Sequence, residues 1–188
     1  MQLIDAIKKR REVKRYSLKK PDWRKVIRAI DTARYSPNAG GQFVIRYVVI
    51  QDEEKIKKLK DATQQSFVGD AKIIVVAVSD DSKLEKFYKD RATRYSSLQA
   101  GASIQNFLLN LTEQGLVTKW VKYFVDDQVK FILEIPDKLQ VEGIFPIGLP
   151  TPHRVEEEYV MPLDNVIYFD KWKQIEMEPR TKVRERNI

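Results

Sequence analysis

The side chains that most often carry enzyme chemistry are scarce in this chain. It contains no cysteine, so cysteine nucleophiles, thiolate metal sites and disulfides are excluded. It contains one histidine, His153, on which a Ser-His-Asp triad or a zinc site would have to depend. Neither a Ser-His-Asp triad nor a zinc site is therefore favoured.

Basic side chains offer a second kind of chemistry, the binding of an anion. The chain carries 34 Lys and Arg against 27 Asp and Glu, and its formal net charge is +7. This balance suits a nucleic acid, a membrane surface or a phosphorylated small molecule. Most individual lysines and arginines are nevertheless expected on a solvated surface, and high charge without cysteine is also typical of thermophilic proteins.

Helix and strand patterns indicate a mixed chain. Helical spacing is expected over residues 3–10, 23–36, 56–59, 80–115 with one break, and 129–133; strands are expected over 43–50, 73–78, 116–121 and 141–147. The continuously apolar run 73–78 predicts a central strand covered on both faces. On the second helix, Trp23, Val26, Ile27 and Ile30 share one face that we expect to be buried. The class is α+β, or α/β with an unusual strand order.

No segment of the sequence suggests a membrane or secreted protein. The longest apolar run is far too short to span a bilayer, and the N-terminal charges follow the apolar residues, which is the wrong order for a secretory signal. We therefore expect a cytoplasmic protein with no membrane partner. Without repeats or linkers, residues 1–188 are expected to form a single domain.

Several short segments are ordered along the chain in a way that suggests a known family. They are RREVKRYS (residues 10–17), YSPNAGGQ (35–42), QSFVGDAKIIVV (65–76), AGASIQNFLLNLTEQGLVTKWV (100–121), FPIGLP (145–150) and FDKW (169–172). Each is weak alone, but together they cover nearly the whole chain. In this order they resemble the nitroreductase family of FMN-dependent flavoproteins.

The resemblance implies a fold and an assembly. The fold is a three-layer α/β/α sandwich with a mostly antiparallel central sheet. The assembly is an intertwined homodimer that binds FMN in a groove at its interface. A C-terminal extension, about residues 159–188, would pack on the partner subunit.

The resemblance also places basic residues near the FMN phosphate or ribityl chain, namely Arg10, Arg11 and Lys14. Arginine suits a phosphate because it offers two donors in a planar fork. Glu12 stands where the family usually has serine, and we expect it to turn outward or to pair with Arg15. The family's second basic pair, near the C-terminus, is missing here.

Further cofactor contacts follow from the other matching segments. Gln65 would bond the polar pyrimidine edge of the flavin, for which a side-chain amide supplies both a donor and an acceptor. The residues that would lie along the flavin ring are Trp120, Val121, Lys122 and Tyr123. Tyr123 is expected to narrow the substrate pocket and Lys122 to favour an anionic substrate. The partner subunit would contribute the loop of Pro37, Asn38, Ala39, Gly40 and Gly41, and His153 and Arg154 would replace the missing basic pair.

The implied function is an oxidoreductase in which flavin N5 carries the chemistry and no side chain is catalytic. NAD(P)H would deliver a hydride and leave, and a nitroaromatic, quinone or similar acceptor would then be reduced, a ping-pong cycle. One alternative is a basic nucleic-acid-binding module, suggested by the charge and by residues 180–186; no recognisable binding motif supports it, so nucleic acid is an unlikely partner. Another is a nitroreductase-like fold with weakened FMN binding.

Overall fold

The computed structural model describes residues 1–152 and 159–177. The chain divides into two units, Met1–Val155 and Glu156–Ile188, and each is described by itself.

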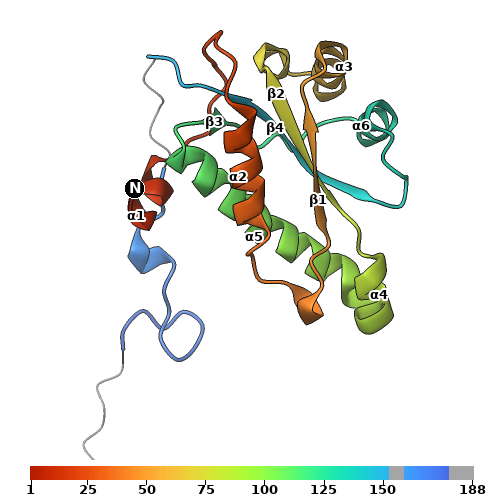
Figure 1. The fold of residues 1–188 in the computed structure, drawn as a ribbon. Helices are drawn as coiled ribbons and strands as arrows, with labels where there is room; N and C mark the ends of the chain where they lie inside the picture. Colours follow the sequence, from red (N-terminus) through yellow and green to blue (C-terminus); the bar gives the residue numbers. More distant parts are fainter. Residues whose placement is uncertain (153–158, 178–188) are drawn as a thin grey trace, which may run out of the picture. The chain divides into compact units, whose positions relative to one another are not determined.

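The first unit is built around a four-stranded antiparallel sheet (Figure 1). Its strands β1 (Ile45–Ile50), β2 (Ile73–Ser79), β3 (Val117–Thr118) and β4 (Gln140–Gly148) are arranged in the order β1-β2-β4-β3. All seven residues of β2 are buried, which confirms the prediction of a central strand. β3 is much shorter than the expected strand 116–121, although Val121 adds an isolated bridge to Ile144.

Helices cover both faces of this sheet (Figure 1). α2 (Trp23–Ala33), α4 (Ser82–Tyr88) and α5 (Ala92–Glu113) pack on one face, and α3 (Glu53–Thr63) and α6 (Asp126–Leu133) pack on the other. Successive residues of β2 alternate between the two layers, as the strand period of two requires: Val75 joins the first core and Val76 the second. The architecture is therefore the expected three-layer α/β/α sandwich of the α+β class.

The long helical stretch breaks once, as the sequence indicated. Between α4 and α5 lies the short 3-10 turn η3 (Lys89–Arg91), where Lys89 has a positive φ of 47°. The apolar stripe of α5 is at most 4% exposed at any position and comprises Ala100, Ile104, Phe107, Leu108 and Leu111. Gly115, with φ 73°, follows the end of the helix and lets the chain turn into β3.

The buried face of α2 differs from the prediction. Val26, Ala29 and Ala33 are fully buried, whereas Trp23 and Ile27 are 45% and 43% exposed. The expectation that Trp23 and Ile27 belong to the buried face is therefore wrong for a single chain. Small alanine side chains let α2 lie close against α5, and this packing leaves the larger residues exposed. Asp22 begins the helix by accepting a hydrogen bond from the Arg24 amide at 3.0 Å.

The remaining short elements of the first unit are α1 (Leu3–Lys9) and the 3-10 turns η1 (Ala39–Gly41) and η2 (Ser66–Asp70). The described part of the second unit contains one 3-10 turn, η4 (Leu163–Asn165), and an edge-to-face pair of Tyr168 and Trp172 with ring centres 4.8 Å apart. In residues 1–152 and 159–177, no helix has the length and hydropathy needed to cross a bilayer.

Candidate functional site

The basic N-terminal segment lies beside β3 and so extends the edge of the sheet. The Val13 amide donates to the Thr118 carbonyl at 3.0 Å, and Glu12 forms a parallel bridge with Thr118. Farther along, the Tyr16 hydroxyl donates to the Val13 carbonyl at 3.0 Å. Burial raises the pKa of Tyr16, and nearby carboxylates raise it further, so this phenol stays neutral. These contacts fix the segment that carries Arg10 and Lys14 against β3.

The Glu12 carboxylate links this N-terminal segment to residues 119–120, which follow β3. It accepts a hydrogen bond from Lys119 Nζ at 2.8 Å and one from the Trp120 amide at 3.4 Å, and Arg10 Nη1 lies 3.9 Å away. The expectation that Glu12 turns outward or pairs with Arg15 is therefore wrong. Lys119 lies within ion-pair distance of Glu12, and its positive charge neutralises the carboxylate.

The three basic residues predicted for the cofactor phosphate have different surroundings. Arg11 turns back onto α1, where its guanidinium donates to the Lys8 and Arg10 carbonyls, and it thereby caps the helix. The Lys14 ammonium lies 5.9 Å from the ring centre of Phe67, a residue of η2. Arg10 lines a cavity of about 230 Å³, which is also lined by Leu108 and Leu111.

The segment predicted to lie along the flavin ring is held by β4 and by Gln65. Trp120 Nε1 donates to the Glu142 carbonyl at 3.1 Å, and Val121 is buried and exchanges two backbone hydrogen bonds with Ile144 at 2.9 and 3.0 Å. Gln65 Nε2 donates to the Tyr123 carbonyl at 3.2 Å. Because Gln65 immediately precedes η2 and Lys14 lies over Phe67 of η2, three predicted segments meet there.

The loop of residues 37–41 lies elsewhere in the chain. Gly40 and Gly41 have positive φ angles of 57° and 72°, which is why glycine is needed at both positions. Gln99 of α5 fixes the end of the loop: its Nε2 donates to the Gln42 carbonyl at 3.0 Å, and its Oε1 accepts from the Val44 amide at 2.7 Å. Figure 1 shows this loop beside α4, at the opposite end of the sheet from β3. One chain therefore does not unite Pro37, Asn38, Ala39, Gly40 and Gly41 with the other predicted contacts. His153 and Arg154 lie outside the described residues.

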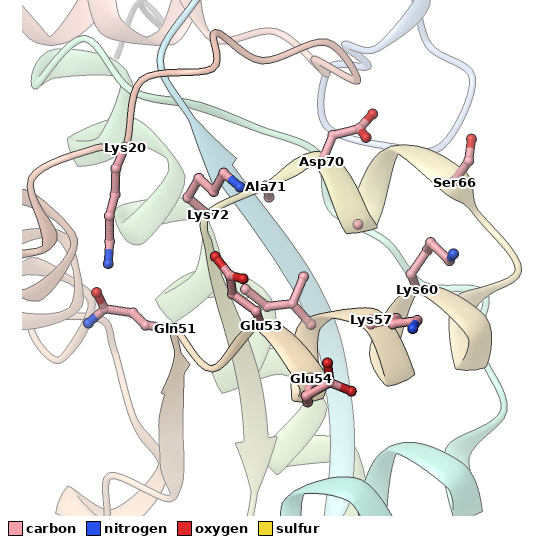
Figure 2. Close-up of a pocket in the computed structure, with 12 residues that line it drawn as sticks. Lys20, Gln51, Glu53, Glu54, Lys57, Lys60, Ser66, Asp70, Ala71 and Lys72 are labelled. Carbon is pink, nitrogen blue, oxygen red and sulfur yellow. The ribbon is translucent and has the colours of Figure 1, made fainter.

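A larger cavity, of about 450 Å³, was not predicted from the sequence. Figure 2 shows its lysine and glutamate side chains, which come from α3 and from the segments that precede α2 and β2, together with Asp70 of η2. Its charged lining residues are Lys20, Glu53, Glu54, Lys57, Lys60, Asp70 and Lys72. Lysines and glutamates on a helix are usually solvated, so the spacing of these residues in the sequence did not predict a cavity. This cavity contains none of the predicted cofactor contacts.

Comparisons with known proteins agree with the fold. Residues 60–149 match the model of the nitroreductase family. A protein of Methanothermobacter thermautotrophicus, named among the NADH dehydrogenases or NAD(P)H nitroreductases, is 24% identical over 177 residues, which are 92% of this chain and 88% of that protein. An iodotyrosine deiodinase of Thermotoga neapolitana is 23% identical over 166 residues, 79% of this chain and 88% of that protein.

A solved structure shares the same architecture. The NADPH:FMN oxidoreductase of Vibrio harveyi, in complex with NAD+, superimposes with a TM-score of 0.80 at 19% identity, over 92% of this chain and 78% of that one. This likeness, and similar ones to structures of nitroreductase-family proteins, show that the chain has the nitroreductase fold. In sequence and in fold, the chain is therefore similar to proteins of the nitroreductase family.

Proposed function

We propose that this protein is an FMN-dependent oxidoreductase that uses NAD(P)H to reduce nitroaromatics, quinones or similar acceptors. One observation carries the proposal. Three segments that are separate in the sequence, and that the resemblance predicts to contact FMN, come together beside β3 and η2. These segments contribute Arg10 and Lys14, Gln65, and residues 120–123. The names of the relatives, which refer to NAD(P)H and to FMN, support the same class of reaction.

The side chains at this place fit an FMN molecule. A phosphate requires charge-assisted donors, which Arg10 and Lys14 supply. The carboxylate of Glu12 would oppose a phosphate, but Lys119 neutralises it at 2.8 Å. Gln65 Nε2 donates to the Tyr123 carbonyl. In the described part of the chain, Gln65 Oε1 keeps the capacity to accept a hydrogen bond from the pyrimidine edge.

When bound, FMN would supply the hydride chemistry, which explains why the chain needs neither cysteine nor a catalytic histidine. The chain's own residues would bind and orient the cofactor. Lys14 and Arg10 would hold its anionic end, and Gln65 would hold the polar edge. Trp120 and Val121, fixed to β4 by side-chain and backbone hydrogen bonds, would give the ring a rigid wall.

We also propose that the working form is a homodimer. The loop of residues 37–41 lies at the other end of the sheet, so a second copy would have to bring it to the cofactor. In the second unit, residues 159–177 expose many large apolar side chains, such as Val160 at 81% and Trp172 at 77%, as expected for a segment that a partner covers. Sedimentation equilibrium should give a molecular mass of twice the chain mass of 22.1 kDa, and the mass of a single chain would overturn the proposed homodimer.

Lys14→Gln tests the proposed site directly. Loss of one charge-assisted contact should weaken FMN binding by about tenfold. The measurement is the quenching of FMN fluorescence when the cofactor-free protein is titrated. Lys19→Gln is the matched control, because Lys19 is an exposed lysine of the same segment. The affinity of this variant for FMN should stay within about twofold of that of the wild type. Equal affinity of the wild type and Lys14→Gln would contradict the assignment of Lys14.

A further inference from the structure

The ammonium group of Lys122 is held at a defined position by Trp120. Lys122 Nζ lies 3.9 Å from the centre of the Trp120 ring. The indole is itself fixed, because its Nε1 donates to the Glu142 carbonyl at 3.1 Å and its ring centre lies 5.9 Å from that of Phe145. Gly143 leaves room for the indole, since a Cβ atom there would overlap it. A cation over an indole face is electrostatically favoured, so this placement has a physical cause.

This positive charge is not neutralised by the carboxylates around the indole. The Glu142 carboxylate accepts a hydrogen bond from Ser79 Oγ at 2.6 Å and forms no ion pair with Lys122, and Glu12 is paired with Lys119 at 2.8 Å. Among the ion pairs of residues 1–152 and 159–177, none includes Lys122. Lys122 therefore presents an exposed cation with capacity for an anionic ligand.

The residue that follows Lys122 in the chain is an exposed aromatic one. The Tyr123 side chain is 73% exposed, while the Tyr123 carbonyl is fixed by Gln65. A short segment that exposes both an aromatic ring and a lysine suits a flat ligand with a negatively charged substituent.

We propose that Lys122 is a specificity-determining residue that favours aromatic electron acceptors bearing a carboxylate. This inference rests on the proposed function, because it concerns the acceptor that would enter the same FMN site. The expected effect is modest, since Lys122 is exposed and water screens its charge. An exposed ion pair corresponds to a preference of about threefold to fivefold.

The direct test is equilibrium binding of two ligands that are not reduced, benzoate and its neutral isostere benzamide. The FMN-loaded protein is titrated with each, and the change in its visible absorption gives the dissociation constant. Benzoate should bind about threefold to fivefold more tightly than benzamide at low salt, and high salt should reduce the difference. The ratio of kcat/KM for para-nitrobenzoate over para-nitrobenzamide should show the same preference.

Three variants separate Lys122 from the general positive charge of the protein. Lys122→Met should abolish the preference for benzoate, and Lys122→Arg should keep it, because arginine also stacks on an indole. Lys57→Met is the control: it removes one exposed lysine from α3, at the cavity of Figure 2, and should leave the preference unchanged.

The outcomes distinguish this inference from the function on which it rests. A yellow, active protein with equal affinity for benzoate and benzamide would overturn the role of Lys122 alone. The same conclusion would follow if Lys122→Met kept the preference. A protein that binds no FMN would overturn the proposed function and the acceptor preference together.

Discussion

Glu12 shows how one residue can depart from a family pattern and still be accommodated. Its carboxylate bonds Lys119 at 2.8 Å and the Trp120 amide at 3.4 Å, so the charge that would oppose a phosphate becomes a link between two segments of the proposed site. Glu12 therefore supports the structure at a position where a contact with the FMN phosphate would otherwise be expected.

Glu12→Ser, which introduces the residue type usual in the family, separates these two effects. Removal of the carboxylate should leave Arg10 and Lys119 more favourable to a phosphate, so FMN should bind about fivefold more tightly. Unfolding free energy should fall by about 0.5–1 kcal/mol, a value reduced by the 37% exposure of Glu12. FMN titration and denaturant unfolding measure the two effects, with Glu54→Ser on α3 as the control. Weaker FMN binding by Glu12→Ser would contradict this account.

The role of a single residue could be predicted from the sequence only where its amino-acid type allows few roles. The glycines at 40 and 41 were expected to shape a loop, and their positive φ angles agree. The partner of Glu12 could not be predicted, because Lys119 lies 107 positions away and only the sheet brings the two together. For Arg11, the sequence could not distinguish a phosphate ligand from the helix cap that it forms.

A buried hydrogen-bonded chain connects three elements of the first core. The Ser103 hydroxyl of α5 donates to the Ala33 carbonyl of α2 at 3.1 Å, and Tyr47 of β1 bonds Ser103 Oγ at 2.8 Å. Burial raises the pKa of Tyr47 to about 12, and the bond with Ser103 opposes that rise. The neutral phenol is therefore the form that the folded state favours.

Tyr47→Phe tests this connection through its dependence on pH. At neutral pH the variant should lose about 1 kcal/mol of unfolding free energy with its hydrogen bond. Because folding raises the pKa above the ordinary value of 10.0, the advantage of the wild type is complete below pH 10 and is lost as the pH rises toward about 12. Denaturant unfolding from pH 8 to 12 measures the difference. A constant difference over that range would contradict the assignment.

At the scale of elements, long periodic segments were predictable and edges were not. β2 and the buried stripe of α5 followed from hydrophobic pattern alone, because each is covered over its whole length. β3 was predicted too long, since its pairing stops after two residues. The buried face of α2 was misplaced because apolar residues occur on more than one of its faces, and only packing against α5 selects alanines over Trp23.

At the scale of the whole molecule, one chain does not bring together all the residues that are proposed to bind FMN. The segments beside β3 come together within one copy, whereas residues 37–41 lie beside α4 at the other end of the sheet (Figure 1). Sequence reasoning could group these residues through resemblance to a family. It could not show from composition or periodicity that they occupy two places, because the sequence does not record which contacts would cross between copies.

The central claim is that this protein carries FMN and exchanges hydride with NAD(P)H. The most direct measurement is the visible absorption spectrum of the purified protein, with FMN added if the protein is colourless, before and after NADH or NADPH. The account predicts flavin bands in the near-ultraviolet and blue that disappear on reduction. A protein that shows no such bands and binds no added FMN would contradict it.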